Sequence, residues 1–107
     1  MKLWIDDVRA VPNGYRGVKS VHEAQKVIKD YELMYKVSGG KSYYKIELID
    51  IDHDAGDFAW DGGDYIKLLD WLEATGRNYP IRIHSMNVVG VENMRRIIQK
   101  NGWTEVR

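Results

Sequence analysis

The stretch Leu48-Ile-Asp-Ile-Asp-His-Asp54 decides the fold, because an apolar, strand-like run there leads directly into polar side chains. Leu3-Trp-Ile-Asp-Asp7 and Ile81-Arg-Ile-His-Ser85 have the same form. If the three strands are parallel, their carboxyl ends meet at one edge, which is where open α/β sheets bind ligands. The polar residues that we expect to share this edge are Asp6, Asp7, Asp52, His53, Asp54, His84 and Ser85.

Helical patterns separate these strands. A capping box at Ser20–Glu23 starts a helix predicted over 20–35. A second predicted helix begins within 61–64 and ends at Gly76. A third runs from Asn87 or Gly90 to Gly102. Short strands at 17–19 and 103–106 would complete the pattern. Alternation of this kind predicts an α/β fold: a parallel sheet of about five strands, with helices on both faces as a three-layer sandwich.

Composition narrows the classes of function. The chain has 107 residues, enough for one domain over 1–107, and its 16 basic and 16 acidic side chains give no net charge. This balance argues against bulk binding of duplex DNA or of an anionic membrane. Cysteine is absent, which excludes disulfides and thiolate zinc sites, and no apolar run is long enough to cross a bilayer. We expect a cytoplasmic protein, and homo-oligomerisation stays open.

The acidic residues at the predicted edge suit a divalent metal. Asp6, Asp7 and Asp52 offer the oxygen ligands that Mg²⁺ or Mn²⁺ prefers, whereas zinc would need both His53 and His84. The alternative for the first pair is a solvated acidic turn capped by Arg9. His53 and His84 are also candidate general acid and base, with Asp54 orienting a histidine.

A phosphate pocket is expected where the third helix begins. Its candidate residues are Ser85, Asn87 and Gly90, although Ser85 and Asn87 could simply cap the helix. Arg9 or Arg96 could add a positive charge. Phe58 and Trp60 are candidates for stacking on a base, with core packing an equal alternative.

Three motifs occur in a fixed order: Asp-Asp-x-Arg at 6–9, Asp-His-Asp-x-Gly at 52–56 and His-Ser-x-Asn-x-Val-Gly at 84–90. Together they resemble the cyclic-phosphate-processing receiver-like family, a divergent branch of the response-regulator receiver fold. The resemblance implies a flavodoxin-like sheet of order 2-1-3-4-5. It also implies that Asp6 and Asp7 are the metal-binding pair, that Asp52 matches the phosphate-accepting aspartate, and that Ser85 matches the hydroxyl residue after strand four.

One departure from an ordinary receiver and one from the family pattern bear on function. Residues 103–107 offer no obvious match for the receiver lysine, and Val88 stands where the family typically has proline. The added His53, Asp54 and His84 favour chemistry on a phosphodiester over a phosphorylation switch.

Three functions follow as hypotheses. The first is a phosphoesterase that opens a cyclic phosphate on a nucleotide or RNA end. The second is non-catalytic binding that sequesters a cyclic nucleotide or a nucleotide-derived signal, as an immune-signal modulator would. The third is a receiver-like phosphoacceptor at Asp52.

Overall fold

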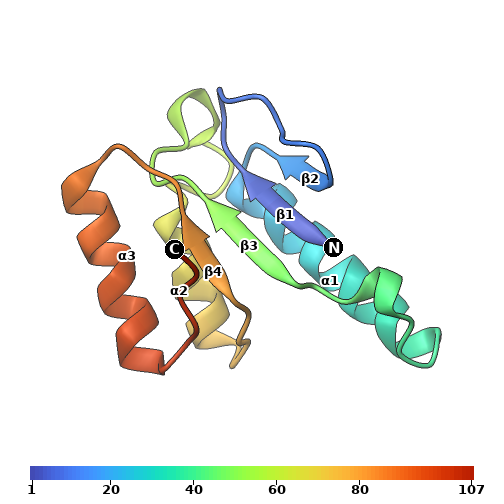
Figure 1. Cartoon of the computed structure of the whole chain (residues 1–107). Helices are drawn as coiled ribbons and strands as arrows, with labels where there is room; N and C mark the ends of the chain where they lie inside the picture. The colour runs from blue at the N-terminus through green and yellow to red at the C-terminus, as the bar shows by residue number, and fades with distance from the viewer.

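The computed structural model describes residues 1–107 (Figure 1). Its elements, in chain order, are β1 (Lys2–Ile5), β2 (Tyr15–Val18), α1 (Val21–Val37), the 3-10 turn η1 (Ser42–Tyr44), β3 (Leu48–Ile51), the 3-10 turn η2 (Gly56–Phe58), α2 (Ile66–Ala74), β4 (Ile81–Ile83) and α3 (Val88–Asn101).

The four strands form one parallel sheet in the order β2-β1-β3-β4. This confirms the receiver-like α/β fold and the predicted order of these strands. A fifth strand is reduced to one parallel bridge between Ile81 and Glu105. The last segment leaves the sheet after two backbone hydrogen bonds to Ile81, while Trp103 packs into the core and Glu105 pairs with Arg95. The sheet therefore has four strands rather than five.

All three helices pack on the same face of the sheet, which corrects the expected three-layer arrangement. Apolar residues of α1, α2 and α3 join Leu3, Ile5, Ile49 and other strand residues in one buried cluster, and α2 touches both other helices. The reason lies in the connections. The loop over 6–14, between β1 and β2, holds no helix, and every later crossover moves the same way across the sheet. Right-handed crossovers in one direction place their helices on one face.

The helix ends follow their predicted capping residues closely. Ser20 accepts a hydrogen bond from the amide of Glu23, Asn87 caps α3, and Gly102 ends α3 with a φ of 66° in the left-handed region. The second helix starts only at Ile66, because residues 61–64 form turns in which Asp64 caps the amide of Ala55. None of the helices has the length and hydropathy that crossing a membrane requires.

Helix α1 is much longer than the strands beside it. Its 17 residues span about 26 Å, whereas a strand of four residues spans about 13 Å. Figure 1 shows its carboxyl-terminal end projecting past the start of β1. This end is fastened by Glu32, which accepts three hydrogen bonds of 2.9–3.1 Å from Arg77 and one from the Tyr79 hydroxyl.

The Glu32 contacts predict how stability depends on pH. Burial alone would raise the pKa of Glu32, but the hydrogen bonds from Arg77 and Tyr79 outweigh it and leave the pKa below its ordinary value. Such a group stabilises the fold fully above the ordinary glutamate pKa, and the stabilisation is lost as the pH falls through the lowered value. Glu32→Gln should therefore cost about 1–2 kcal/mol at neutral pH, and less in acid. Urea unfolding of both proteins at neutral pH and near pH 3 measures this, and a difference that stays constant would contradict it.

Candidate functional site

The carboxyl ends of β1, β3 and β4 bring the predicted residues together at one edge. Asp6 and Asp7 follow β1, Asp52 and His53 follow β3, and His84 follows β4. Asp6, Asp7 and Asp52 can each place a carboxylate oxygen within 4.8 Å of the other two. The side chains of Asp6 and Asp52 are buried, so their charges need partners inside the protein.

Asp6 is the most heavily bonded of these carboxylates. Its Oδ1 accepts the backbone amides of Val8 and Arg9 at 2.9 and 3.0 Å, and its Oδ2 faces Arg9 Nη1 and His84 Nε2 at 2.9 Å each. Burial works to raise the pKa of Asp6, but these hydrogen bonds outweigh it and lower the pKa to about 2. Asp6 is therefore a carboxylate at any pH at which the protein would work.

Arg9 acts as the cation over the acidic edge. Its Nη1 donates to Asp6 Oδ2 at 2.9 Å and to Asp52 Oδ2 at 3.1 Å, so one guanidinium nitrogen bridges two buried carboxylates. The other Asp52 oxygen accepts the amide of His53 at 2.7 Å. The Arg9 side chain is 42% exposed, which leaves it room to swing towards a ligand.

His84 lies between two carboxylates on different strands. Its Nδ1 is 2.6 Å from Asp50 Oδ1 in β3, and its Nε2 is 2.9 Å from Asp6 Oδ2 after β1. An ionised carboxylate only accepts hydrogen bonds, so both ring nitrogens donate when both partners are ionised. His84 is thus fully engaged within the protein, and removing it would leave two buried carboxylates facing each other.

Trp4 covers one side of this imidazole. The two rings are stacked, with centroids 3.8 Å apart and planes within 4°. The indole nitrogen of Trp4 is buried without a hydrogen-bond partner. Tyr15 packs edge-on against Trp4 and donates its hydroxyl to Asp50 at 3.2 Å, so the face of the sheet that lacks helices carries a polar layer around His84.

His53 is arranged differently from His84. Its Nδ1 is 2.9 Å from Asp54 Oδ1, and the Nδ2 of Asn87 lies 3.4 Å from both Asp54 oxygens. If Nδ1–H donates to Asp54, Nε2 is left as an acceptor, and no residue of the protein hydrogen-bonds to it. The hydrogen bond from His53, followed by that from Asn87, holds the pKa of Asp54 below its ordinary value although partial burial opposes this.

Gly90 makes room for His53. A Cβ placed at Gly90 would lie 2.4 Å from His53 Cγ, too close for any side chain. The Gly90 amide donates to Asn87 Oδ1 at 2.9 Å, so it serves the helix cap and is not free for a phosphate. The amides with no place in the helix ladder are those of Val88 and Val89, at the first two positions of α3.

The remaining predicted residues lie further from the cluster. Ser85 Oγ accepts the amide of Asn87 at 3.1 Å, which is a capping contact at the edge of the site. Arg96 lies two turns along α3, about 12 Å from its start, and bonds Asn93 on the same helix. Trp60 is 80% exposed, and Phe58 lies under the ammonium of Lys19. Neither aromatic residue contacts the carboxylates or histidines described above.

Several contacts of the site were not predicted from the sequence motifs. Trp4, Tyr15 and Arg82 surround Asp50 or His84 through strand register, which pairs Trp4 with Asp50 and Asp50 with Arg82. Gly56 lies so close to Asp7 that an added Cβ would be 2.3 Å from its Oδ2. Alternation along the strands could have placed Trp4, Asp50 and Arg82 on one face; Gly56 is the glycine of the motif at 52–56, but its contact with Asp7 depends on loop geometry.

The acidic residues fit a divalent cation. Carboxylate oxygens suit Mg²⁺ or Mn²⁺, and the cluster has an electrostatic need for positive charge. Burial raises the pKa of the Tyr65 hydroxyl beneath them, and the negative charges of Asp7 and Asp6 raise it further. Arg9 already meets part of that need, so a metal ion and the guanidinium would compete for Asp6 and Asp52.

The carboxyl edge is an open surface. The two cavities of the structure, of about 370 and 500 Å³, lie at the amino ends of the strands instead. Neither cavity is lined by a residue of the carboxyl edge.

A parallel sheet of this order, with acidic residues after β1 and β3 and a hydroxyl residue after β4, defines a receiver-like domain. The family described as the Cyclic-phosphate processing Receiver domain matches residues 1–100, and the chain belongs to this family. The resemblance seen in the three motifs is thereby confirmed. No curated protein and no solved structure shows significant similarity to the chain.

The Arg9 bridge predicts a link between stability and divalent metal. Arg9→Gln should destabilise the fold, because two buried carboxylates lose their shared cation. Without the competing guanidinium, Mg²⁺ should raise the melting temperature more in this variant than in the unmodified protein. Thermal unfolding with and without Mg²⁺ measures both effects.

Arg82→Gln is the matched control, because Arg82 Nη1 lies 3.7 Å from Asp50 but outside the group of three aspartates. Its Mg²⁺ response should equal that of the unmodified protein. Equal Mg²⁺ responses in all three proteins would refute the competition.

The Gly90 contact predicts that His53 can be displaced without loss of stability. Alanine favours a helix over glycine by about 0.5–1 kcal/mol, so Gly90→Ala should not weaken α3 itself. The added methyl group should instead push the His53 ring away from Asp54. We expect a melting temperature within a few degrees of the unmodified protein and clear displacement of the His53 resonances in NMR spectra. An unmoved His53 would contradict the prediction.

Proposed function

We propose that the carboxyl edge hydrolyses a cyclic phosphodiester on a nucleotide or an RNA end. Membership of a cyclic-phosphate processing family supports the class of substrate. The observation that carries the reaction is the His53–Asp54 pair, which leaves His53 Nε2 without a hydrogen-bond partner in the protein, beside the groups that we propose to bind the phosphate.

His53 is the proposed general base. With its Nδ1 proton held by Asp54, Nε2 takes a proton from water as the water oxygen attacks phosphorus. One of the two ester P–O bonds of the ring breaks, and its oxygen leaves as a hydroxyl after accepting a proton, which His53 can return. Asp54 positions the ring and stabilises the imidazolium that forms.

The phosphate would be held between Arg9 and the start of α3. Arg9 pairs with Asp52 of the acidic cluster, and the amides of Val88 and Val89 lie at the start of α3, next in sequence to Ser85 and Asn87. A helix start favours an anion. The negative charges of Asp6 and Asp52 would repel a phosphate, so the cation that shields them is part of the site.

A Mg²⁺ or Mn²⁺ ion held by Asp6, Asp7 and Asp52 would supply that shielding and polarise a phosphoryl oxygen. His84 has a positioning role in this scheme: both its nitrogens serve Asp6 and Asp50, so it fixes the carboxylates and leaves proton transfer to His53. The proposal therefore gives His53 and His84 different roles, whereas the sequence suggested acid–base roles for both.

The test is turnover of a panel of 2′,3′-cyclic mononucleotides and cyclic dinucleotides, with and without Mg²⁺, read by mass spectrometry. A linear product is expected for at least one of them. His53→Gln should lower its rate by about 10²–10⁴-fold, the usual contribution of a general base, with little change in melting temperature.

His22→Gln is the matched control. His22 forms an equivalent pair with Asp61, with Nδ1 3.0 Å from Oδ1, at the exposed start of α1. Its loss should leave turnover unchanged. Equal rates for His53→Gln and the unmodified protein would reject the assignment of the base.

Two further outcomes separate the other two hypotheses, one in the turnover panel and one in a labelling experiment. Recovery of bound but intact cyclic nucleotide would identify a binding protein. A mass gain on Asp52 after incubation with acetyl phosphate, absent from Asp52→Asn, would identify a phosphoacceptor.

A further inference from the structure

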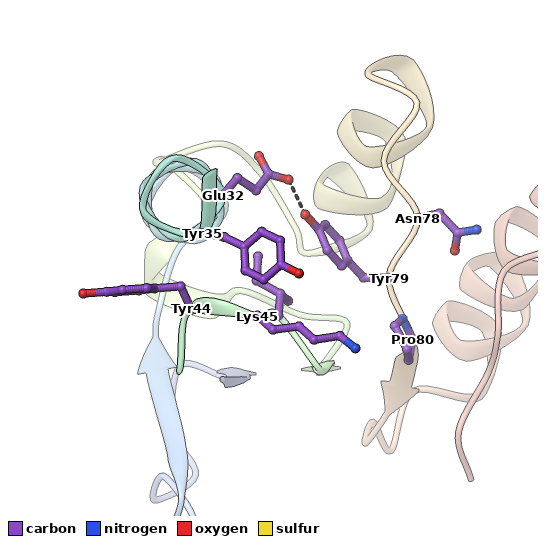
Figure 2. A pocket seen from close by; sticks show the side chains of 8 residues that line it. Glu32, Tyr35, Tyr44, Lys45, Asn78, Tyr79 and Pro80 are labelled. Carbon is purple, nitrogen blue, oxygen red and sulfur yellow. Dashed lines mark hydrogen bonds between the residues drawn. The ribbon is translucent and has the colours of Figure 1, made fainter. Parts of the chain in front are cut away.

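A second candidate binding site lies at the amino end of the sheet, at the opposite end from the carboxyl-edge site. It is a cavity of about 370 Å³ (Figure 2), within the size range of small-molecule sites. Three tyrosines supply much of its wall. The complete lining is Glu32, Tyr35, Tyr44, Lys45, Ile46, Asn78, Tyr79 and Pro80.

The overhang of α1 creates this cavity. Tyr35 comes from the part of α1 that projects beyond the sheet, Tyr44 from η1, and Tyr79 from the segment that leads into β4. Ile46 and Pro80 precede β3 and β4, so the cavity adjoins the opposite ends of the two strands that carry Asp52 and His84. It is therefore separate from the carboxyl edge.

One wall of the cavity is fixed before any ligand arrives. The Tyr79 hydroxyl donates to Glu32, the dashed contact in Figure 2, and Glu32 is in turn gripped by Arg77. The Arg77 guanidinium lies 4.3 Å from the centre of the Trp71 ring. This chain joins α1, α2 and the β4 lead-in, and a fixed wall lowers the entropic cost of binding.

The charge of the cavity is positive. Its only carboxylate, Glu32, is neutralised by Arg77, whereas the ammonium of Lys45 forms no ion pair. Figure 2 shows the Lys45 side chain extending along the cavity below Tyr35 and Tyr79, with the Tyr35 hydroxyl turned towards Tyr79. Tyr35 Oη and Lys45 Nζ make no hydrogen bond within the protein, so both can meet a ligand.

Aromatic walls and an unpaired cation together define a ligand class. Tyrosine rings favour a planar aromatic group, and an unpaired ammonium favours a phosphate or carboxylate. A neutral aromatic compound would leave Lys45 unused, and a simple anion would leave the rings unused. We propose that this cavity binds a mononucleotide, whose base packs against Tyr35 and Tyr79 and whose phosphate meets Lys45.

The experiment uses the whole protein and 5′-AMP, followed by NMR titration and calorimetry, with adenosine and inorganic phosphate as separate probes. AMP should shift the resonances of Tyr35, Tyr44 and Tyr79. It should bind more tightly than either adenosine or phosphate. Shifts confined to residues 52–54 and 84–90 would place AMP at the carboxyl edge and overturn the proposal, as would no shift at millimolar AMP.

Two exposed residues allow a test by substitution without loss of the fold. Tyr35→Ala should weaken AMP binding by about tenfold, since stacking on one aromatic ring contributes about 1–3 kcal/mol. Lys45→Gln should weaken it about two- to fivefold, as expected for an exposed charge pair, and should leave adenosine binding unchanged.

Lys29→Gln is the control for loss of one positive charge, because Lys29 is exposed on α1 and does not line the cavity. It should bind AMP as the unmodified protein does. His53→Gln should also leave AMP binding unchanged, which separates this proposal from the proposed reaction. If His53→Gln weakens AMP binding and Tyr35→Ala does not, the proposal is refuted while the function at the carboxyl edge stands.

Discussion

The structure depends on a buried hydrogen-bonded chain that runs from Asp50 through His84 to Asp6. These residues lie on or directly after three adjacent strands, and the contacts of 2.6 and 2.9 Å tie the strand ends together. Two carboxylates so close to each other in a protein interior repel strongly unless a cation lies between them. The His84 ring lies between them within hydrogen-bonding distance of both, and the remaining members of the site are arranged around it.

Each of the three buried carboxylates has its own compensation. Asp6 has two backbone amides and Arg9, Asp52 has Arg9 and the amide of His53, and Asp50 has the Tyr15 hydroxyl and Arg82. Asp7 makes no ion pair and lies against Gly56. The buried carboxylates are therefore paired within the protein. The groups left available to a ligand are the His53 Nε2 nitrogen, the Asp7 carboxylate, the partly exposed Arg9 side chain and the first amides of α3.

Sequence reasoning reached the strand ends because apolar runs that stop at Asp6, Asp52 and His84 are local patterns. It could not separate the roles of His53 and His84, because these depend on which carboxylate each ring meets across the sheet. The contact between Gly90 and His53 is equally non-local, and the placement of the helices on one face follows from strand order together with a helix-free first connection.

The stacking of Trp4 on His84 has a consequence for how this protein can be observed. The emission of an indole ring depends on the groups packed against it, and the His84 ring lies only 3.8 Å from that of Trp4. Trp4 thus gives the acidic edge an optical reporter that belongs to the chain itself. Any event that draws Asp6 away from His84 should register as a change in emitted light, with no dye attached.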